Sequence, residues 1–407
     1  MRIGHFAPHI WAPGGIATYI ARLGTAQTSR GHDVWYFSCD DEPSGAPAGK
    51  KRSVLLDDPT TLLRRAHDLG IDVLHLHKHA PVASTPDATS DLGSPLVPCV
   101  RTMHGNQGSC PSGTRFLSRT GTACNRAYSP LGCLWGHVVD GCGSRHPSSL
   151  VNSFRRYHTE VEQASRTPTM TVSRFLRDEM VRSGCDPNPL HVIPSPAPTV
   201  STFTDVPDDD VPRMLFLGRI VPHKGLGWLL DALARVDVPL HVDVAGDGYH
   251  CDAMRRQAAR LGIADRVTFH GWVNPNRAGS LIDASRAVIF PSIWHEPAGL
   301  VTLEAAAHAR PVIASTVGGI PEYAHPDFAL HVFAGDTASM ARAMTDLATD
   351  LPRAQTMGRA GRRHAETTFA MDTYLDRVED LYRHVLANVT PDVPDDAPAP
   401  VPSDTVA

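Results

Sequence analysis

Two glutamates in the second half of the chain are the first candidates for chemistry. Glu296 and Glu304 begin and end the segment EPAGLVTLE. If that segment were helical throughout, the two carboxylates would lie about 12 Å apart along the axis, at about 1.5 Å per residue. A glycoside hydrolase holds its two carboxylates within roughly 5–9.5 Å of each other. The pair therefore fits the two ends of one long ligand better than the two sides of a scissile bond.

Two cations, Arg219 and Lys224, bracket a turn in the same half of the chain. The turn follows the apolar run 214–217 and precedes Gly225, so it is typical of a junction between a strand and a helix. At such a junction a guanidinium and an ammonium can neutralise a diphosphate leaving group. The alternative interpretation is that both side chains are ordinary surface charges.

Both glutamates lie within residues 287–322, which predict strand, loop, helix and strand in turn. The loop carries Glu296, the helix begins at about Gly299 and carries Glu304, and residues 311–314 form the second strand. Free N–H groups and the helix dipole make such a loop an anion site. We expect a phosphorylated, hydroxyl-rich ligand here, with Glu296 turned towards its hydroxyl groups. Two solvated glutamates are the alternative.

The first half of the chain offers a glycine turn and a histidine. Residues 2–7 predict the first strand, after which Gly14 and Gly15 turn the chain into a helix. Glycine lets the backbone approach a ligand closely, although a plain tight turn would use the same residues. Residues 97–103 predict a later strand that ends at His104. Because the carboxyl ends of parallel strands face the crevice, His104 either reaches a ligand or serves as a hydrogen-bonding side chain.

Taken together, these motifs resemble those of the retaining GT-B glycosyltransferases of family 4. The resemblance implies two Rossmann-like domains that face each other across a cleft, with a C-terminal helix that crosses back to the first domain. The segment EPAGLVTLE departs from the family at Ala298, where an aromatic residue is usual. The resemblance rests on the ordered occurrence of Gly14-Gly15, His104, Arg219, Lys224, Glu296 and Glu304.

The resemblance also implies a role for each motif. Arg219 and Lys224 would grip the donor diphosphate, Glu296 would hold hydroxyl groups of the donor sugar, and Glu304 would hold the ribose. The expected catalytic residues are Arg219, Lys224, Glu296 and His104. The expected donor-binding residues are Gly14, Gly15, Gly246, Trp272, Val273, Gly299, Leu300, Val301 and Glu304.

A chain of 407 residues is expected to form two domains. We predict the α/β class, with an acceptor-binding domain over residues 1–200 and a nucleotide-sugar-binding domain over residues 211–370. The polar segment 199–210 is the expected linker. Residues 371–387 predict the amphipathic crossover helix, and residues 389–407, rich in proline and aspartate, predict a disordered tail.

Two groups of residues could hold a metal. Residues 106–167 interrupt the α/β alternation and contain four soft ligands, namely Cys110, Cys124, Cys133 and Cys142. Their spacing lacks a C-x2-4-C knuckle, so a metal, a disulfide pair and free thiols all stay open. The second group lies on one face of the predicted strand 72–77 and comprises His75, His77 and His79. The favoured interpretation there is a strand at the edge of the cleft, where polar residues are tolerated.

Composition argues against several classes of protein. A net charge of −5 argues against nucleic acid as the main partner. No run of 18 or more apolar residues occurs, and residues 1–6 lack the pattern of a signal peptide. Eight cysteines without such a signal indicate reduced thiols in the cytoplasm. Gly246-Asp247-Gly248 lacks the third glycine of a dinucleotide fingerprint, since Cys251 stands in its place.

The expected function is transfer of a hexosyl unit with retention, from a nucleoside diphosphate sugar to a small-molecule, glycan or lipid-linked acceptor. A UDP-sugar is favoured over a GDP-sugar. We expect no metal and no cofactor beyond this co-substrate, and peripheral contact with a membrane surface stays open. The alternatives are a sugar phosphorylase or nucleotide-sugar epimerase of the same architecture, and a non-catalytic nucleotide-sugar-binding protein.

Overall fold

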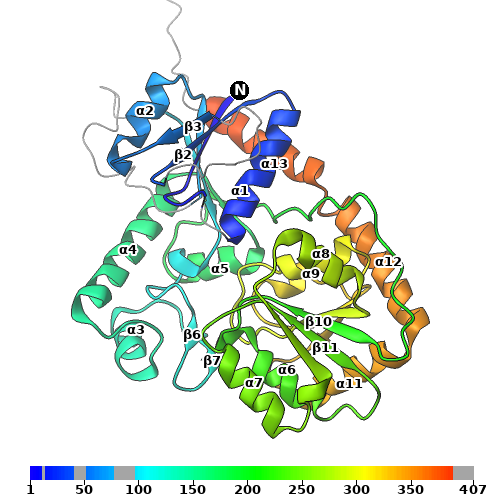
Figure 1. Cartoon of the computed structure of the whole chain (residues 1–407). Helices are drawn as coiled ribbons and strands as arrows, with labels where there is room; N and C mark the ends of the chain where they lie inside the picture. Colours follow the sequence, from blue (N-terminus) through cyan, green and yellow to red (C-terminus); the bar gives the residue numbers. More distant parts are fainter. Residues whose placement is uncertain (12–13, 41–51, 78–96, 388–407) are drawn as a thin grey trace, which may run out of the picture.

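The structure is a computed structural model that describes residues 1–11, 14–40, 52–77 and 97–387. Within these ranges the chain forms two α/β domains (Figure 1). The tail predicted for residues 389–407 and the histidine at position 79 lie outside the described residues.

The first domain is built on a seven-stranded parallel sheet with the strand order β3-β2-β1-β4-β5-β8-β9. The order reverses between β1 and β4, and open α/β sheets bind ligands at such a reversal. The elements of the domain are β1 (Arg2–Phe6), α1 (Gly15–Ser29), β2 (Asp33–Ser38), β3 (Arg52–Leu55), α2 (Leu62–Asp68), β4 (Val73–Leu76), β5 (Cys99–Met103), β8 (Thr169–Thr171), α5 (Arg174–Arg182) and β9 (Leu190–Val192).

The second domain repeats this plan with six parallel strands in the order β12-β11-β10-β13-β14-β15. Here the order reverses between β10 and β13. The elements of the domain are β10 (Arg213–Leu217), α6 (Leu226–Leu233), β11 (His241–Ala245), α7 (Cys251–Arg260), β12 (Val267–Gly271), α8 (Pro275–Asp283), β13 (Ala287–Phe290), α9 (Leu300–Ala307), β14 (Val312–Ser315), α10 (Ile320–Tyr323), β15 (Ala329–Val332), α11 (Thr337–Thr349) and α12 (Leu351–Thr367).

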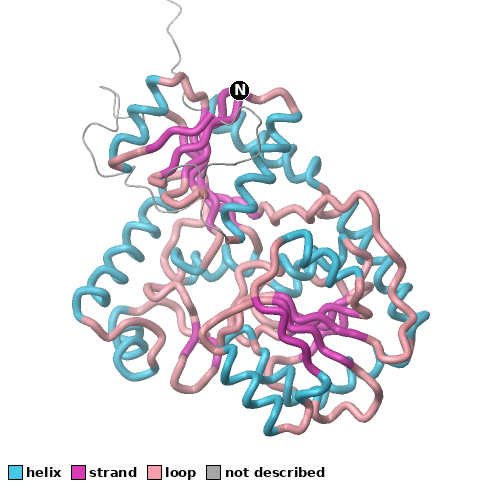
Figure 2. Tube along the Cα trace, in the orientation of Figure 1, coloured by secondary structure: helices cyan, strands magenta, loops and turns pink. Residues whose placement is uncertain are grey.

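The second sheet is covered by helices on both faces (Figure 2). Strands that are buried on both sides consist of apolar residues throughout, and β13 and β14 are buried at every position. Alternate residues of β13 enter different cores: Ile289 packs on one side of the sheet, and Val288 and Phe290 pack on the other. These two cores hold the sheet rigid, so the loops at its carboxyl edge have a firm base.

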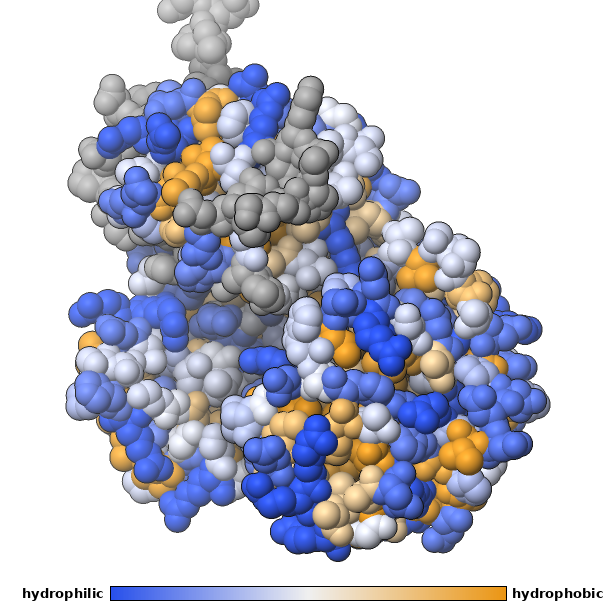
Figure 3. Space-filling model, in the orientation of Figure 1, coloured by the Kyte–Doolittle hydropathy of each residue, from blue (hydrophilic) through white to orange (hydrophobic). Residues whose placement is uncertain are grey.

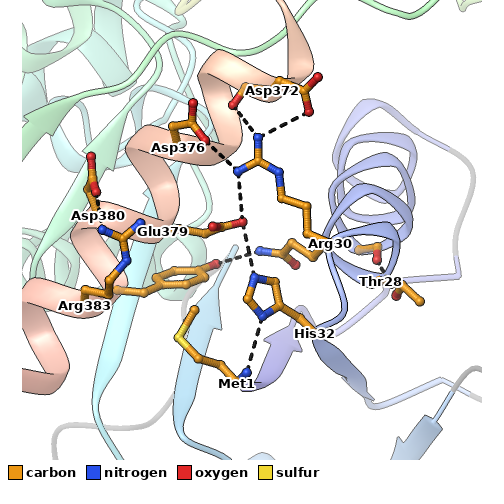
Figure 4. Close-up of polar contacts among 12 residues, drawn as sticks. Met1, Thr28, Arg30, His32, Asp372, Asp376, Glu379, Asp380 and Arg383 are labelled. Carbon is orange, nitrogen blue, oxygen red and sulfur yellow. Dashed lines mark hydrogen bonds and ion pairs between the residues drawn. The ribbon is translucent and has the colours of Figure 1, made fainter.

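Helix α13 (Met371–Ala387) leaves the second domain and packs beside α1 of the first, as predicted (Figures 1 and 4). Its buried face, which includes Tyr374, Val378 and Tyr382, belongs to the core of the first domain. Arg30, which follows α1, pairs with the carboxylates of Asp372, Asp376 and Glu379 (Figure 4). Exposed ion pairs stabilise little, so the apolar face accounts for most of the docking free energy.

The predicted interruption of the first domain lies between β5 and β8. It contains a hairpin of β6 (Phe116–Leu117) and β7 (Thr122–Ala123), the short helix α3 (Pro130–Trp135) and the 20-residue helix α4 (Pro147–Arg166). The interruption of the α/β alternation was predicted, whereas helix α4 was not. The buried side of α4 combines Tyr157 and Ala164 with Glu160 and Gln163, so polar side chains interrupt the apolar pattern by which a helix is recognised.

None of the helices in the described ranges is long and apolar enough to cross a membrane. On the face drawn in Figure 3, hydrophobic residues lie scattered among hydrophilic ones.

Candidate functional site

The strongest candidate site lies at the reversal of strand order in the second domain. Arg219 and Lys224 follow β10, and Ser292 and Glu296 follow β13, the neighbouring strand. Both loops leave the carboxyl edge of the sheet, which explains how residues about 70 positions apart come together. The structure therefore brings together two of the residues that the sequence assigned to one ligand.

Lys224 and Glu296 form an ion pair in this site. Lys224 Nζ donates to Glu296 Oε1 over 2.5 Å, and Ser292 Oγ donates to the same oxygen over 2.7 Å. The Glu296 side chain is only 7% exposed, and the Lys224 side chain 16%. No described residue donates a hydrogen bond to Glu296 Oε2, so this oxygen is available to a ligand hydroxyl.

Gly225 makes the close approach of these two loops feasible. Its φ is 76°, in the region that favours glycine, and a Cβ atom there would lie 1.8 Å from the carbonyl oxygen of Pro291. The lysine loop therefore lies directly against the strand that leads to Glu296. Gly246 has a similar role, since a Cβ atom on it would lie 1.9 Å from the carbonyl oxygen of Gly218. Backbone packing alone accounts for this glycine.

Arg219 differs from Lys224 in its surroundings. Its side chain is exposed and makes no hydrogen bond or ion pair with the described part of the chain. Its charge still reaches the lysine loop: burial, together with the charges of Lys224 and Arg219, lowers the pKa of His223 to about 4, although the charge of Glu296 opposes this shift. An exposed guanidinium beside a paired ammonium leaves a net positive field at the carboxyl edge of β10.

The residues expected at the donor lie along the same edge. Gly299 precedes α9, Leu300 and Val301 form its first turn, and Glu304 stands one turn further on. Burial raises the pKa of Glu304, although the charge of Arg22 on α1 opposes this shift. Beyond β12, Trp272 is 69% exposed and Val273 is half-buried.

The Gly14-Gly15 turn of the first domain lies close to helix α9 of the second domain. Gly15, at the start of α1, lines a cavity of about 70 Å³ together with Arg22, Leu300 and Glu304. The predicted proximity of this turn to the donor helix is thus present. Gly14, directly before it, has a φ of 156°, and a Cβ atom there would contact nothing.

His104 ends a buried chain of hydrogen bonds in the first domain. Its Nε2 lies 3.3 Å from Nδ1 of His77, whose Nε2 lies 2.9 Å from Nδ1 of His5. His5 Nε2 lies 2.7 Å from the side-chain oxygen of Gln27, which can only accept a hydrogen bond. Tyr19 packs edge-on against the His104 ring, with centroids 4.7 Å apart.

Burial determines the direction in which hydrogen bonds are donated from His104 to Gln27. It lowers the pKa of His5 to about 4 and that of His77 well below the usual range, so both rings are neutral near pH 7. A neutral ring has one donor and one acceptor nitrogen. Because His5 donates to Gln27, it must accept from His77, and His77 must accept from His104. Nε2 of His104 therefore carries a proton.

The histidines of β4 are not an open metal site. His5, His75 and His77 bring one nitrogen each within 4.8 Å of one another. All six of their ring nitrogens, however, already have a hydrogen-bond partner, since His75 contacts Tyr382 and Thr102. Strand β4 lies in the middle of the sheet, beside the reversal of strand order, and His75 and His77 are buried, so exposure at a cleft edge does not account for these histidines.

Residues of the two domains meet next to Glu296. Ser173 caps α5, and its hydroxyl donates to the carbonyl oxygen of Pro297 over 2.6 Å. Glu322 accepts hydrogen bonds of 2.8 Å from the backbone N–H groups of Arg174 and Phe175. These contacts hold the Glu296 loop against the first domain. Glu322 was missed in the sequence because its partners lie in the other domain.

The segment between β5 and α4 also contacts the site. The side-chain oxygen of Asn125 lies 2.6 Å from Nε2 of His295, and Asn106 donates to the carbonyl oxygen of His295 over 3.0 Å. Phe116 packs on His223, with ring centroids 5.6 Å apart. These contacts reach the direct neighbours of Glu296 and Lys224, and no local sequence motif marks the residues that make them.

Comparison with known proteins agrees with this geometry. Residues 13–200 match the family model described as Glycosyltransferase Family 4, and residues 211–350 match the one described as Glycosyl transferases group 1. An alpha-maltose-1-phosphate synthase from Mycobacterium tuberculosis is 31% identical over 265 residues, 56% of this chain and 67% of that protein. A D-inositol 3-phosphate glycosyltransferase from Streptomyces avermitilis is 36% identical over 181 residues, 41% of this chain and 39% of that protein.

Solved structures share the fold over nearly the whole chain. The sucrose-phosphate synthase of Thermosynechococcus elongatus superposes with a TM-score of 0.67 at 19% identity, covering 95% of this chain and 99% of that one. Anabaena HepE in complex with UDP and glucose gives a TM-score of 0.67 at 16% identity, over 94% and 100%. The chain therefore belongs to the family 4 glycosyltransferases and has their GT-B fold.

Proposed function

We propose that this glycosyltransferase moves a hexosyl unit, with retention and without a metal, from a nucleoside diphosphate sugar to an acceptor in the cleft between the domains. A UDP-sugar is the favoured donor and a GDP-sugar the next. The observation that carries the proposal is the buried pair of Lys224 and Glu296 at the reversal of strand order, with Arg219 exposed beside it. In this proposal Lys224 contacts the diphosphate of the donor, and Glu296 contacts the sugar attached to it.

The charges of this site suit a donor with a diphosphate. Arg219 offers a guanidinium that no described residue pairs with, and Lys224 can exchange Glu296 for a phosphate oxygen. Glu296 then keeps the hydrogen bond from Ser292 and accepts hydroxyl groups of the sugar. Two preorganised cations stabilise the charge that develops on the departing diphosphate, which is the role that a metal has in other transferases.

The surroundings of Glu296 also favour retention without a protein nucleophile. In the proposed complex this carboxylate accepts hydrogen bonds from Ser292 and from the hydroxyl groups of the sugar, so it holds the donor and does not attack it. In the proposed same-face mechanism, the acceptor hydroxyl attacks on the side that the diphosphate leaves. An oxygen of the departing phosphate takes the hydroxyl proton.

The names of similar proteins support this class of reaction. HepE structures contain UDP and UDP-glucose, which supports a UDP-sugar donor. The relatives named for inositol 3-phosphate and maltose 1-phosphate support a small-molecule acceptor, whereas the structural neighbour WaaG, involved in lipopolysaccharide biosynthesis, supports a lipid-linked glycan. None of the cysteines in the described residues forms a disulfide, which agrees with the proposed reducing, cytoplasmic location.

The first experiment is a thermal-shift screen against UDP-, GDP-, TDP- and ADP-sugars, because a ligand that binds the native state raises the apparent stability. We expect one nucleotide series to raise the melting temperature. The stabilising donor is then incubated with candidate acceptors. A transferase consumes it only when an acceptor is present, an epimerase consumes it alone, and a phosphorylase requires free phosphate. Failure of every nucleotide sugar to bind would refute the proposal.

A further inference from the structure

The four cysteines between β5 and α4 converge on one cavity. They come from separate places: Cys110 precedes the hairpin, Cys124 follows β7, Cys133 lies in α3 and Cys142 follows the turn after α3. All four line the same cavity of about 20 Å³. A cavity of roughly 10–15 Å³ or more holds one water molecule, so this one has room for a single ion and is too small for an organic ligand.

His137 adds an unsatisfied nitrogen to the wall of this cavity. The ring is buried, and its Nδ1 donates to the carbonyl oxygen of Cys133 over 2.9 Å. Its Nε2 therefore has a lone pair but finds no partner in the described ranges. A buried polar atom without a partner costs about 1–3 kcal/mol. Such an atom beside four thiols indicates a site that is made for a ligand.

Arg115 supplies donors that suit thiolate groups. Its side chain lines the cavity and is buried, with an ion pair to Glu179 over 2.6 Å. Nε and Nη1 of the same guanidinium, however, have no acceptor in the part of the chain that the structure describes. Four thiolates around a divalent cation have a net charge of −2, and buried guanidinium N–H groups would stabilise that charge.

The segment also needs a cross-link for physical reasons. None of the hydrophobic cores of the described ranges includes a residue between 104 and 160. The apolar side chains that the segment does have are largely on the outside, since Leu131 is 81% exposed and Trp135 59%. A segment without its own core usually depends on a disulfide or a structural metal.

We propose that Cys110, Cys124, Cys133 and Cys142 bind one zinc ion that stabilises this segment. Zinc prefers tetrahedral thiolate sites with Zn–S distances of about 2.3 Å, which place the sulfur atoms about 3.8 Å apart. No three of the four sulfur atoms lie within 4.8 Å of one another in the described structure. Binding would therefore draw them together around the cavity.

The zinc would act on the donor site through the contacts of the segment. Asn125, directly after Cys124, contacts His295, and Phe116 packs on His223. Zinc would thus hold Asn125 and Phe116 of the first domain in place against the residues next to Glu296 and Lys224. The metal assignment does not depend on the proposed transfer reaction, because it rests on the cavity alone.

The test is the metal content of protein purified without chelators. We expect about one zinc per chain, measured by inductively coupled plasma mass spectrometry. Cys133→Ser and Cys142→Ser should lose the metal. Cys251→Ser, which removes a half-buried thiol of α7 that does not line the cavity, should keep it. In the unmodified protein, titration with a mercurial should release the zinc as about four thiols react.

Three results would overturn the assignment. One is protein with neither bound zinc nor zinc uptake and with every thiol reactive. Another is an intact mass about 2 or 4 Da below that of the reduced chain, which would show disulfides instead. The third is iron with absorbance in the visible range, which would indicate a cluster in place of one ion. Release from the unmodified protein keeps the test valid if a serine variant fails to fold.

Discussion

Lys224 and Glu296 are partners of each other, across 72 positions of sequence and from the ends of two neighbouring strands. Sequence motifs assign the lysine to a diphosphate and the glutamate to a sugar, as if the two were separate. In the folded chain each neutralises the other in a largely buried site. Removing one partner leaves the other as an uncompensated charge, so single and double substitutions should differ in their effects.

Lys224→Met should lower kcat by about 10²–10³-fold, the usual cost of removing a preorganised cation or donor. The dissociation constant for the donor should rise by no more than about tenfold, because Arg219 still binds the diphosphate. Steady-state kinetics and calorimetry measure the two quantities separately. Arg235→Ala, an exposed cation at the other end of α6, is the matched control. Equal losses in binding and turnover would contradict a role in the transition state.

Glu296→Gln should separate nucleotide binding from sugar binding. The amide keeps a partner in Ser292 but no longer holds Lys224, which becomes free for phosphate. We expect UDP, or the nucleotide that the screen identifies, to bind as well as before or more tightly. Turnover of the nucleotide sugar should fall by about 10²-fold. Calorimetry with nucleotide and nucleotide sugar side by side tests this, and equal weakening of both ligands would argue against it.

The buried histidine chain should make the protein less stable in acid. The pKa of His5 is lowered from 6.5 to about 4 by burial, so in this window the unfolded chain binds more protons than the folded one. Stability is therefore complete above pH 6.5 and declines as the pH falls towards 4. One such group contributes at most about 3 kcal/mol, at about 1.4 kcal/mol per pKa unit.

His5→Gln should flatten this dependence. Urea unfolding at several pH values between 7 and 4.5 measures the free energy of unfolding and its slope with pH. His158→Gln, at an exposed ring, is the control and should leave the slope unchanged. If the His5 variant keeps the slope of the unmodified protein, its neutral burial is not a source of acid sensitivity.

Gln27→Met should disturb His104 from the far end of the hydrogen-bond chain. Without the amide oxygen, His5 no longer has to donate at Nε2, so both neutral tautomers of His104 become accessible. We expect kcat/KM to fall by about tenfold with a changed pH profile. Nitrogen NMR of the His104 ring should show a mixture of tautomers. Thr25→Ala, on the exposed side of α1, should change neither property.

Some elements were predictable and others were not, for identifiable reasons. The bounds of α13 agree with the sequence prediction and those of β1 differ from it by one residue, because both have a clear apolar pattern. Strand β3 was not predicted, since three of its four residues are exposed at the edge of the sheet. Helix α4 was not predicted, since Glu160 and Gln163 stand beside Tyr157 and Ala164 on its buried side and interrupt the apolar pattern.

The sequence by itself determined the two α/β series, the order of the motifs and the junction at which each motif stands. These features depend on local properties: apolar runs that form buried strands, glycines that permit close turns, and free N–H groups at helix starts. Only the tertiary structure decided which side chains meet. Lys224 contacts Glu296, His104 is linked to Gln27 through His77 and His5, and four cysteines share one cavity. Strand order and packing bring these distant segments together, and neither can be read from the spacing of residues along the chain.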